Sequence, residues 1–151
     1  MNTVSKASKV ACALLLLVWV VGCGKKDPEP EKDLADTVIG NYVLFKVILR
    51  TQTLEPPFKL GNIEFSEEYI VTKLFAERAR ITIVGYEKEN GITTQNRLEI
   101  DLSLIKQPNG EIHFVFPNSP DKPSAIYKDN FLTSYGLDDD DFPVSYLARR
   151  K

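Results

Sequence analysis

The chain has 151 residues, of which 43% are hydrophobic and 26% charged, an ordinary globular composition for one domain rather than two. The first 22 residues contain two lysines and no acidic residue, so removing these two from the 19 basic residues leaves 17 basic against 21 acidic side chains, a net charge of −4. This acidic balance argues against nucleic-acid binding, because phosphate recognition needs a net basic face.

The amino-terminal segment has the pattern of a helical signal peptide. Lys6 and Lys9 form a positive region, and an unbroken apolar run of 12 residues follows over 10–21. A helix that spans a bilayer needs about 20 apolar residues, so this run is short for a membrane span and typical of a signal-peptide core. We therefore predict that residues 1–22 are removed; the alternative is an uncleaved anchor.

Four residues at the end of this run carry a resemblance. Val20, Val21, Gly22 and Cys23 are similar to the lipobox of bacterial lipoproteins, in which aliphatic and small residues precede an invariant cysteine. The resemblance implies that Cys23 receives a diacylglycerol, that a peptidase cleaves between Gly22 and Cys23, and that the new amino terminus is acylated, for example with palmitate. Two or more acyl chains anchor a protein stably to a membrane.

The residues after Cys23 predict a flexible tether. Residues 24–36 carry charges of both signs, two prolines and no aromatic side chain, so they cannot bury apolar area. We therefore divide the chain into a signal peptide at 1–22, a lipidated cysteine with a disordered tether at 23–36, and a folded domain at 37–151.

The start of the tether bears on where the protein lies. Gly24 stands where an aspartate would resemble an inner-membrane retention signal, so we expect the outer membrane of the cell envelope. Lys25, Lys26 and Asp27 are similar to the export tethers of surface-displayed lipoproteins, and a plain spacer is the alternative.

From Val38 onward the dominant hydrophobic period is two, which indicates strands. Leu98, Ile100, Leu102 and Leu104 alternate with polar residues, so one face should be core and the other solvent. In the first strand the apolar positions 43, 45, 47 and 49 predict the inner face. The candidate strands are residues 41–50, 69–74, 78–87, 97–106, 111–116, 126–135 and 142–150.

Turn signals indicate how these strands connect. Asn90-Gly91 and Asn109-Gly110 supply the positive φ of tight hairpins, so the neighbouring strands should be antiparallel. We predict an all-β fold, a single small antiparallel meander barrel of seven to eight strands. The alternative is an α+β fold with one helix near 66–80, where Ser66 is a candidate N-cap and the apolar residues also fit a helical face.

The two ends of the folded part carry a second resemblance. Ile39-Gly40-Asn41-Tyr42 and the terminal Tyr146–Lys151 are similar to the lipocalin-like pattern, a Gly-x-aromatic start and a last strand with a basic residue. The resemblance implies that Gly40, Tyr42 and either Arg149 or Arg150 close one end of the barrel. This sequence has Tyr42 where tryptophan is usual.

Candidate catalytic or metal-binding residues are few. His113 is the only histidine and alternates with apolar neighbours, which predicts an outward position. The run 138–141 is four aspartates without the spacing of a calcium-binding loop, so we expect a solvated turn. Glu67-Glu68 and Glu87-x-Glu89 are carboxylate pairs whose convergence the sequence cannot establish. We predict no catalytic residue, metal or cofactor.

Two functions remain after these exclusions. The first is a non-enzymatic, lipocalin-like binding module for a small apolar or amphipathic ligand. The second is a structural or protein-interaction lipoprotein of the envelope with a filled core, since an eight-stranded barrel can either fill its interior or hold one small ligand. In both, the chain contacts the membrane through its lipid anchor and is expected to be a monomer.

Overall fold

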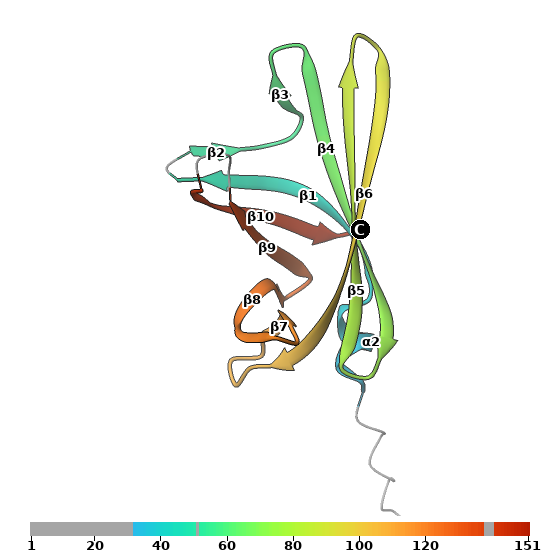
Figure 1. Ribbon diagram of the computed structural model, residues 1–151, viewed down its shortest axis with the longest axis vertical. Helices are drawn as coiled ribbons and strands as arrows, with labels where there is room; N and C mark the ends of the chain where they lie inside the picture. Colours follow the sequence, from blue (N-terminus) through green and yellow to red (C-terminus); the bar gives the residue numbers. More distant parts are fainter. Residues whose placement is uncertain (1–31, 51, 138–140) are drawn as a thin grey trace, which may run out of the picture. The chain divides into compact units, whose positions relative to one another are not determined.

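The structure is a computed structural model, and it describes residues 32–50, 52–137 and 141–151. Antiparallel strands form a closed eight-stranded meander barrel, because β1 pairs with β10 on one side and with β4 on the other (Figure 1). The barrel strands are β1 (Gly40–Leu49), β4 (Ile63–Phe75), β5 (Arg78–Glu89), β6 (Ile92–Lys106), β7 (Ile112–Phe116), β8 (Ser119–Lys128), β9 (Phe131–Leu137) and β10 (Pro143–Arg150). This confirms the predicted all-β barrel.

Residues 66–80 are strand, turn and strand, so the helical alternative for this segment is wrong. β4 and β5 pair from Ile63 with Glu89 to Phe75 with Arg78, with one register shift between Lys73 and Phe75. Tyr69 and Val71 face inward and are 2% exposed each, which is the alternation of a half-buried strand. β-branched and aromatic residues favour this extended form over a helix.

Two short strands lie outside the predicted set. β2 (Gln52–Leu54) pairs with the end of β1, and β3 (Phe58–Leu60) pairs with the start of β4. β1 and β4 pair with each other only through residues 40–43 and 68–71. Beyond that point the two barrel strands separate, and each takes a short partner of its own.

The folded unit begins earlier than the boundary we predicted at residue 37. A helix, α2 (Leu34–Val38), packs on the barrel, and Ala35 and Val38 are fully buried. The Ala35 amide donates to the Ala76 carbonyl at 3.0 Å, and Lys73 forms ion pairs with acidic residues that flank Ala35. The unit therefore starts at Lys32; composition missed this because two apolar side chains suffice to dock one helical turn.

The first strand changes phase in its middle. A bulge between Leu44 and Lys46 shifts the register with β10, so Tyr42, Leu44 and Val47 face the core. Our prediction that residues 43 and 45 face inward was wrong. The Phe45 ring instead packs against the Phe131 ring, with centroids 5.9 Å apart.

Residues 126–135 are a hairpin and not the single strand that we predicted. Asp129 and Asn130 have φ values of 50° and 69° and join β8 to β9. Positive φ at both central positions is the geometry of a two-residue hairpin turn that Asp and Asn tolerate. The predicted Asn90-Gly91 and Asn109-Gly110 turns are confirmed, with Gly91 at 81° and Gly110 at 85°.

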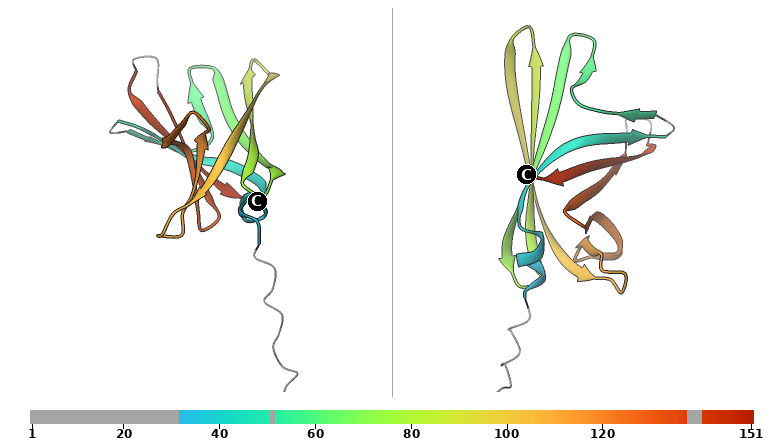
Figure 2. Two further views of the ribbon diagram at one scale, coloured as in Figure 1. Left: turned by 60° about the horizontal axis from the view of Figure 1, so that its bottom comes forward. Right: turned by 180° about the vertical axis from the view of Figure 1, so that it is seen from behind.

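The two ends of the barrel differ. The tips of the β3–β4 and β5–β6 hairpins lie together at one end, here called the open end, and α2 lies at the other, the closed end (Figures 1 and 2). Near α2 the interior is filled by tightly buried side chains, among them Tyr42, Leu102, Phe114 and Leu132. The core therefore sits toward the closed end.

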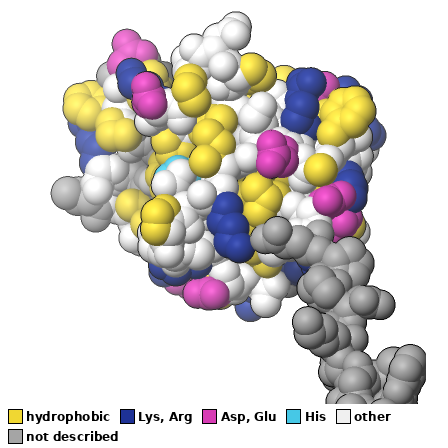
Figure 3. Space-filling view, turned by 90° about the horizontal axis from the view of Figure 1, so that it is seen from below, with side chains coloured by type: hydrophobic (Ala, Val, Ile, Leu, Met, Phe, Trp, Pro, Cys, Tyr) yellow, Lys and Arg dark blue, Asp and Glu magenta, His cyan; other side chains and the backbone are white. Residues whose placement is uncertain are grey.

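The outer surface is mixed in character. Seen from the closed end, hydrophobic, basic and acidic side chains are interspersed (Figure 3). Across β5 and β6, Arg80 donates to Asp101 at 2.6 Å and to Glu99 at 3.0 Å. No helix among the described residues has the length and hydropathy to span a membrane.

The segments that carry the signal-peptide and lipobox predictions, residues 1–31 with Cys23, lie outside the described residues, as do Asp138–Asp140.

Candidate functional site

A cavity of about 420 Å³ lies in the barrel, on the side of the core nearer the open end. Its volume is within the range of small-molecule sites, roughly 300–1,000 Å³. The wall is mostly hydrocarbon, with a few hydroxyl groups and one carboxylate. The lining residues are Glu67, Tyr69, Ile81, Ile83, Leu98, Ile100, Leu102, Phe116, Ser124, Ala125, Ser134, Tyr135, Gly136 and Tyr146.

Small inward residues on two neighbouring strands leave this space. Ala125 on β8 is paired with Ser134 on β9, and Gly136 follows two residues later. The Tyr146 ring occupies the room left at Gly136, where an added Cβ would lie 3.3 Å from the ring. Larger residues on the opposite wall do not fill the space that these small residues leave, so a cavity remains. The cavity is large enough for a ligand.

A break in the barrel wall connects the cavity to solvent. β6 pairs with β7 only from Ser103 to Lys106, so Leu98 and Ile100 have a strand partner on the β5 side alone. Leu98 and Phe116 both line the cavity, yet they are 56% and 45% exposed. An apolar ligand would cover these side chains and remove their surface from water.

Glu67 brings a carboxylate into this apolar wall. The Tyr69 hydroxyl donates to Glu67 Oε2 at 2.9 Å, and the Ser134 hydroxyl donates to the Tyr69 oxygen at 3.3 Å. Burial raises the pKa of the Glu67 carboxyl, against the opposing effect of the Tyr69 hydrogen bond. Burial also raises the pKa of Tyr69, helped by the nearby Glu67 carboxylate, so the phenol stays a donor.

The one charged side chain among the described residues that line the cavity is acidic. No Lys, Arg or His is found among the described lining residues. Glu87 and Glu89 follow Glu67 along the same face toward the hairpin tip, where they line a smaller pocket of about 180 Å³. A ligand approaching from the open end therefore meets carboxylates before it meets the apolar wall.

Of the two carboxylate pairs in the sequence, Glu87 and Glu89 line the same pocket, but Glu67 and Glu68 do not act as a pair. Glu67 faces the cavity, whereas Glu68 faces outward and accepts from Lys151 Nζ at 2.8 Å. Adjacent residues of a strand point to opposite faces, so the two carboxylates diverge. Among the described residues, no three His, Cys, Asp or Glu side chains come together as a metal site would require.

His113 lies on the outside of β7, between Ile105 and Ile126 on the neighbouring strands. Its Nε2 is 3.4 Å from Glu111 Oε2. Its neighbours Ile112 and Phe114 face the core. The ring therefore has no access to the cavity.

Gly40, Tyr42 and Arg150 come together at the closed end, whereas the side chain of the neighbouring Arg149 does not join them. The Arg150 guanidinium donates to the Ile39 and Thr37 carbonyls at 2.6 and 2.9 Å and lies over the Tyr42 ring, 5.5 Å from its centroid. Burial raises the pKa of Tyr42 to about 12, although Arg150 opposes this. A Cβ at Gly40 would lie 3.0 Å from Arg150 Nε, so glycine makes room for the arginine. Arg149 is exposed on the outer face.

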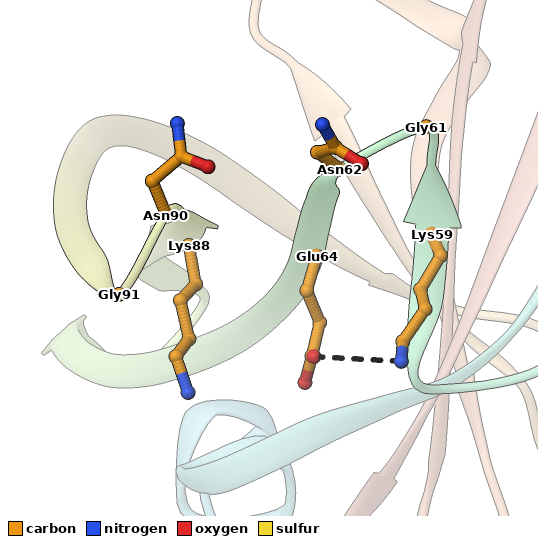
Figure 4. A pocket seen from close by; sticks show the side chains of 7 residues that line it. All are labelled: Lys59, Gly61, Asn62, Glu64, Lys88, Asn90 and Gly91. Atoms are coloured by element: carbon orange, nitrogen blue, oxygen red, sulfur yellow. Dashed lines mark ion pairs between the residues drawn. The ribbon is translucent and has the colours of Figure 1, made fainter.

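A second pocket, of about 240 Å³, lies between the two hairpin tips at the open end (Figure 4). Lys59, Glu64 and Lys88 extend side by side, while the Asn62 and Asn90 amides point the other way. The Lys59–Glu64 ion pair is 4.0 Å long, and its side chains are 63% and 46% exposed. Such exposed, screened charges discriminate poorly between ligands, so this pocket is the weaker candidate.

The sequence singled out Glu67 only as one of a carboxylate pair, and it did not single out the cavity residue Ser134. Glu67 shares the parity of Tyr69 and Val71, which is the signal that would have placed it inward. Because Glu67 and Glu68 are both charged, their own polarity does not show which one faces the core, and only the parity with Tyr69 separates them. The inward position of Ser134 was missed because we predicted residues 126–135 to be one strand.

Comparisons of the chain with family models, curated proteins and solved structures found no significant match.

Proposed function

We propose that the barrel binds a small apolar or amphipathic ligand and performs no chemistry on it. The observation that carries this proposal is the cavity of about 420 Å³, whose hydrocarbon wall includes the exposed side chains of Leu98 and Phe116. Protein interiors are normally close-packed, and side chains that line an empty cavity of this size lose van der Waals contacts that a filled core would make. A ligand-binding role gives the void a reason, and a filled-core interaction protein would not need it.

We further propose that the protein works at the cell envelope as a lipid-anchored monomer. This rests on the lipobox-like residues Val20–Cys23 and on the resemblance to lipoprotein signal peptides. The outer membrane is the proposed location, since Gly24 lacks the acidic character of an inner-membrane retention signal. Fatty-acid labelling should be lost in Cys23→Ala; labelling that persists in this variant would refute the anchor.

The binding proposal is tested by native mass spectrometry of the full-length protein extracted from its own membranes. We expect a population heavier than the lipidated chain by the mass of one noncovalent ligand, which dissociates on activation in the gas phase. Ala125→Leu, which places a larger side chain in the cavity, should reduce this population. A spectrum that contains only the bare lipidated mass would count against ligand carriage.

A further inference from the structure

The cavity combines one carboxylate with an apolar wall and no cation. Glu67 Oε2 accepts from Tyr69, but no described residue donates to Glu67 Oε1. Glu67 is half-buried, and its Oε1 is not among the buried side-chain atoms that lack a hydrogen-bond partner, so this oxygen is within reach of water. A ligand that displaces this water must supply a hydrogen bond or the opposite charge, because an unpaired carboxylate in an apolar site is costly. The site thus presents an acceptor that the described protein groups leave half satisfied.

The binding affinity of a ligand should depend on the head group that it places beside this acceptor. A protonated amine would bring donors and a positive charge to Glu67, and its alkyl or aryl body could lie against Ile83, Leu98 and Ile100. A carboxylate ligand would meet Glu67 at short range with no basic side chain in the described lining to offset the repulsion. A neutral alcohol could donate one hydrogen bond without the charge.

The inner face of β5 next to Glu67 carries further negative charge. Glu87 and Glu89 lie along the inner face of β5 beyond Gly85, the residue that pairs with Glu67. Gly85 has no side chain to cover the carboxylate, and open space surrounds its Cβ position. A cation is therefore attracted at the mouth and can reach Glu67.

We infer that the ligand of the cavity is an amphipathic amine, with its apolar body in the barrel and its ammonium group hydrogen-bonded to Glu67. This inference rests on the proposed function, because it names the ligand class of the same site.

The experiment compares three probes that share one alkyl chain and differ in the head group: octylamine, octanol and octanoate. Each is titrated at neutral pH by calorimetry into the full-length protein held in lipid nanodiscs, with empty nanodiscs subtracted. We expect octylamine to bind about ten-fold more tightly than octanol, or better, which is the range for one charge-assisted hydrogen bond, and octanoate to bind most weakly.

Two neighbouring variants form a matched pair. Glu67→Gln should remove the preference for octylamine, since the amide keeps the shape and loses the charge. Glu68→Gln alters the outward carboxylate of the next residue and should leave the preference unchanged. Far-UV circular dichroism of both variants checks that the barrel is folded.

The outcomes separate the two proposals. Equal affinities for the three probes, tighter binding of octanoate, or an unchanged preference in Glu67→Gln would overturn the amine assignment and leave the binding function standing. Failure of all three probes to bind would overturn the proposed function and the assignment with it.

Discussion

Arg150 joins the last strand to the segment that enters the first. Its guanidinium donates to two backbone carbonyls, Thr37 and Ile39, and lies over the rings of Tyr42 and Tyr127 at 5.5 and 5.6 Å. Thr37, Ile39 and Tyr42 each lie more than a hundred residues before Arg150 in the chain, so the contact links the two ends of the folded unit. Its role is structural, because it lies at the filled end of the barrel.

Replacing this arginine should destabilise the fold. Arg150→Met removes the donors to two carbonyls and the cation over two rings, and we expect a loss of about 2–4 kcal/mol in the free energy of unfolding. Arg149→Met, on the exposed outer face, should change it by less than about 0.5 kcal/mol. Urea unfolding followed by circular dichroism measures both, and equal effects would show that Arg150 is an ordinary surface residue.

Glu67 should cost stability when it is ionised. Burial raises its folded-state pKa above the ordinary 4.5, so the cost is absent below pH 4.5 and fully present above the folded pKa. Glu67→Gln keeps an acceptor for the Tyr69 hydroxyl and removes the charge. Its melting temperature should exceed that of the parent at pH 7, and the difference should shrink at acid pH; a difference independent of pH would contradict a buried, charged Glu67.

Among the elements, the two hairpins with Asn-Gly turns were the part best predicted from the sequence. The alternation over 97–106 and the Asn-Gly turns could be predicted because each depends on residues close together in the sequence. Alternation sets the inner and outer faces of a strand, and Asn-Gly supplies the positive φ of a tight turn. Two of the errors arose where a distant partner decides the local form. The bulge in β1 depends on its register with β10, and α2 is held by β4, neither of which composition reports.

The site was less predictable than the fold for a related reason. A cavity is the space left by side chains from several strands, and no single strand records it. Ala125, Ser134 and Gly136 are unremarkable in the sequence, but pairing places them on one stretch of wall. The turn at Asp129-Asn130 carried a readable signal, and recognising it would have set the parity of β9 correctly.

The β5–β6 turn offers a test of backbone conformation without side-chain contacts. Gly91 has a φ of 81° with nothing within 4 Å of its Cβ position, so Gly91→Ala should cost about 1–2 kcal/mol through strain alone. Gly85→Ala, in the same hairpin with equal space but without positive φ, should be neutral or slightly stabilising. Thermal unfolding of the two variants should show these opposite trends; equal losses would mean that the turn geometry is not what Gly91 provides.

The molecule as a whole divides into a filled half and a half with free space. Ala79 and Ala125 are both almost completely buried, but only Ala125 lines the cavity. Ala125→Leu should therefore stabilise the protein by about 0.5–2 kcal/mol, because it fills empty space. Ala79→Leu must displace packed neighbours at the closed end and should cost about 1–3 kcal/mol. Chemical denaturation measures the pair, and a loss of similar size in both would contradict free space beside Ala125.

Binding inside the barrel is tested most directly by methyl NMR of the full-length protein in nanodiscs during titration with octanol. The methyl groups of Ile83, Leu98 and Ile100 line the cavity, whereas those of Ile105 and Ile126 lie on the outer face beside His113. We predict saturable shifts in the first group, none in the second, and weaker binding of octanol in Ala125→Leu, which narrows the cavity. Shifts confined to the outward methyl groups, or no shifts at all, would contradict a ligand site in the cavity.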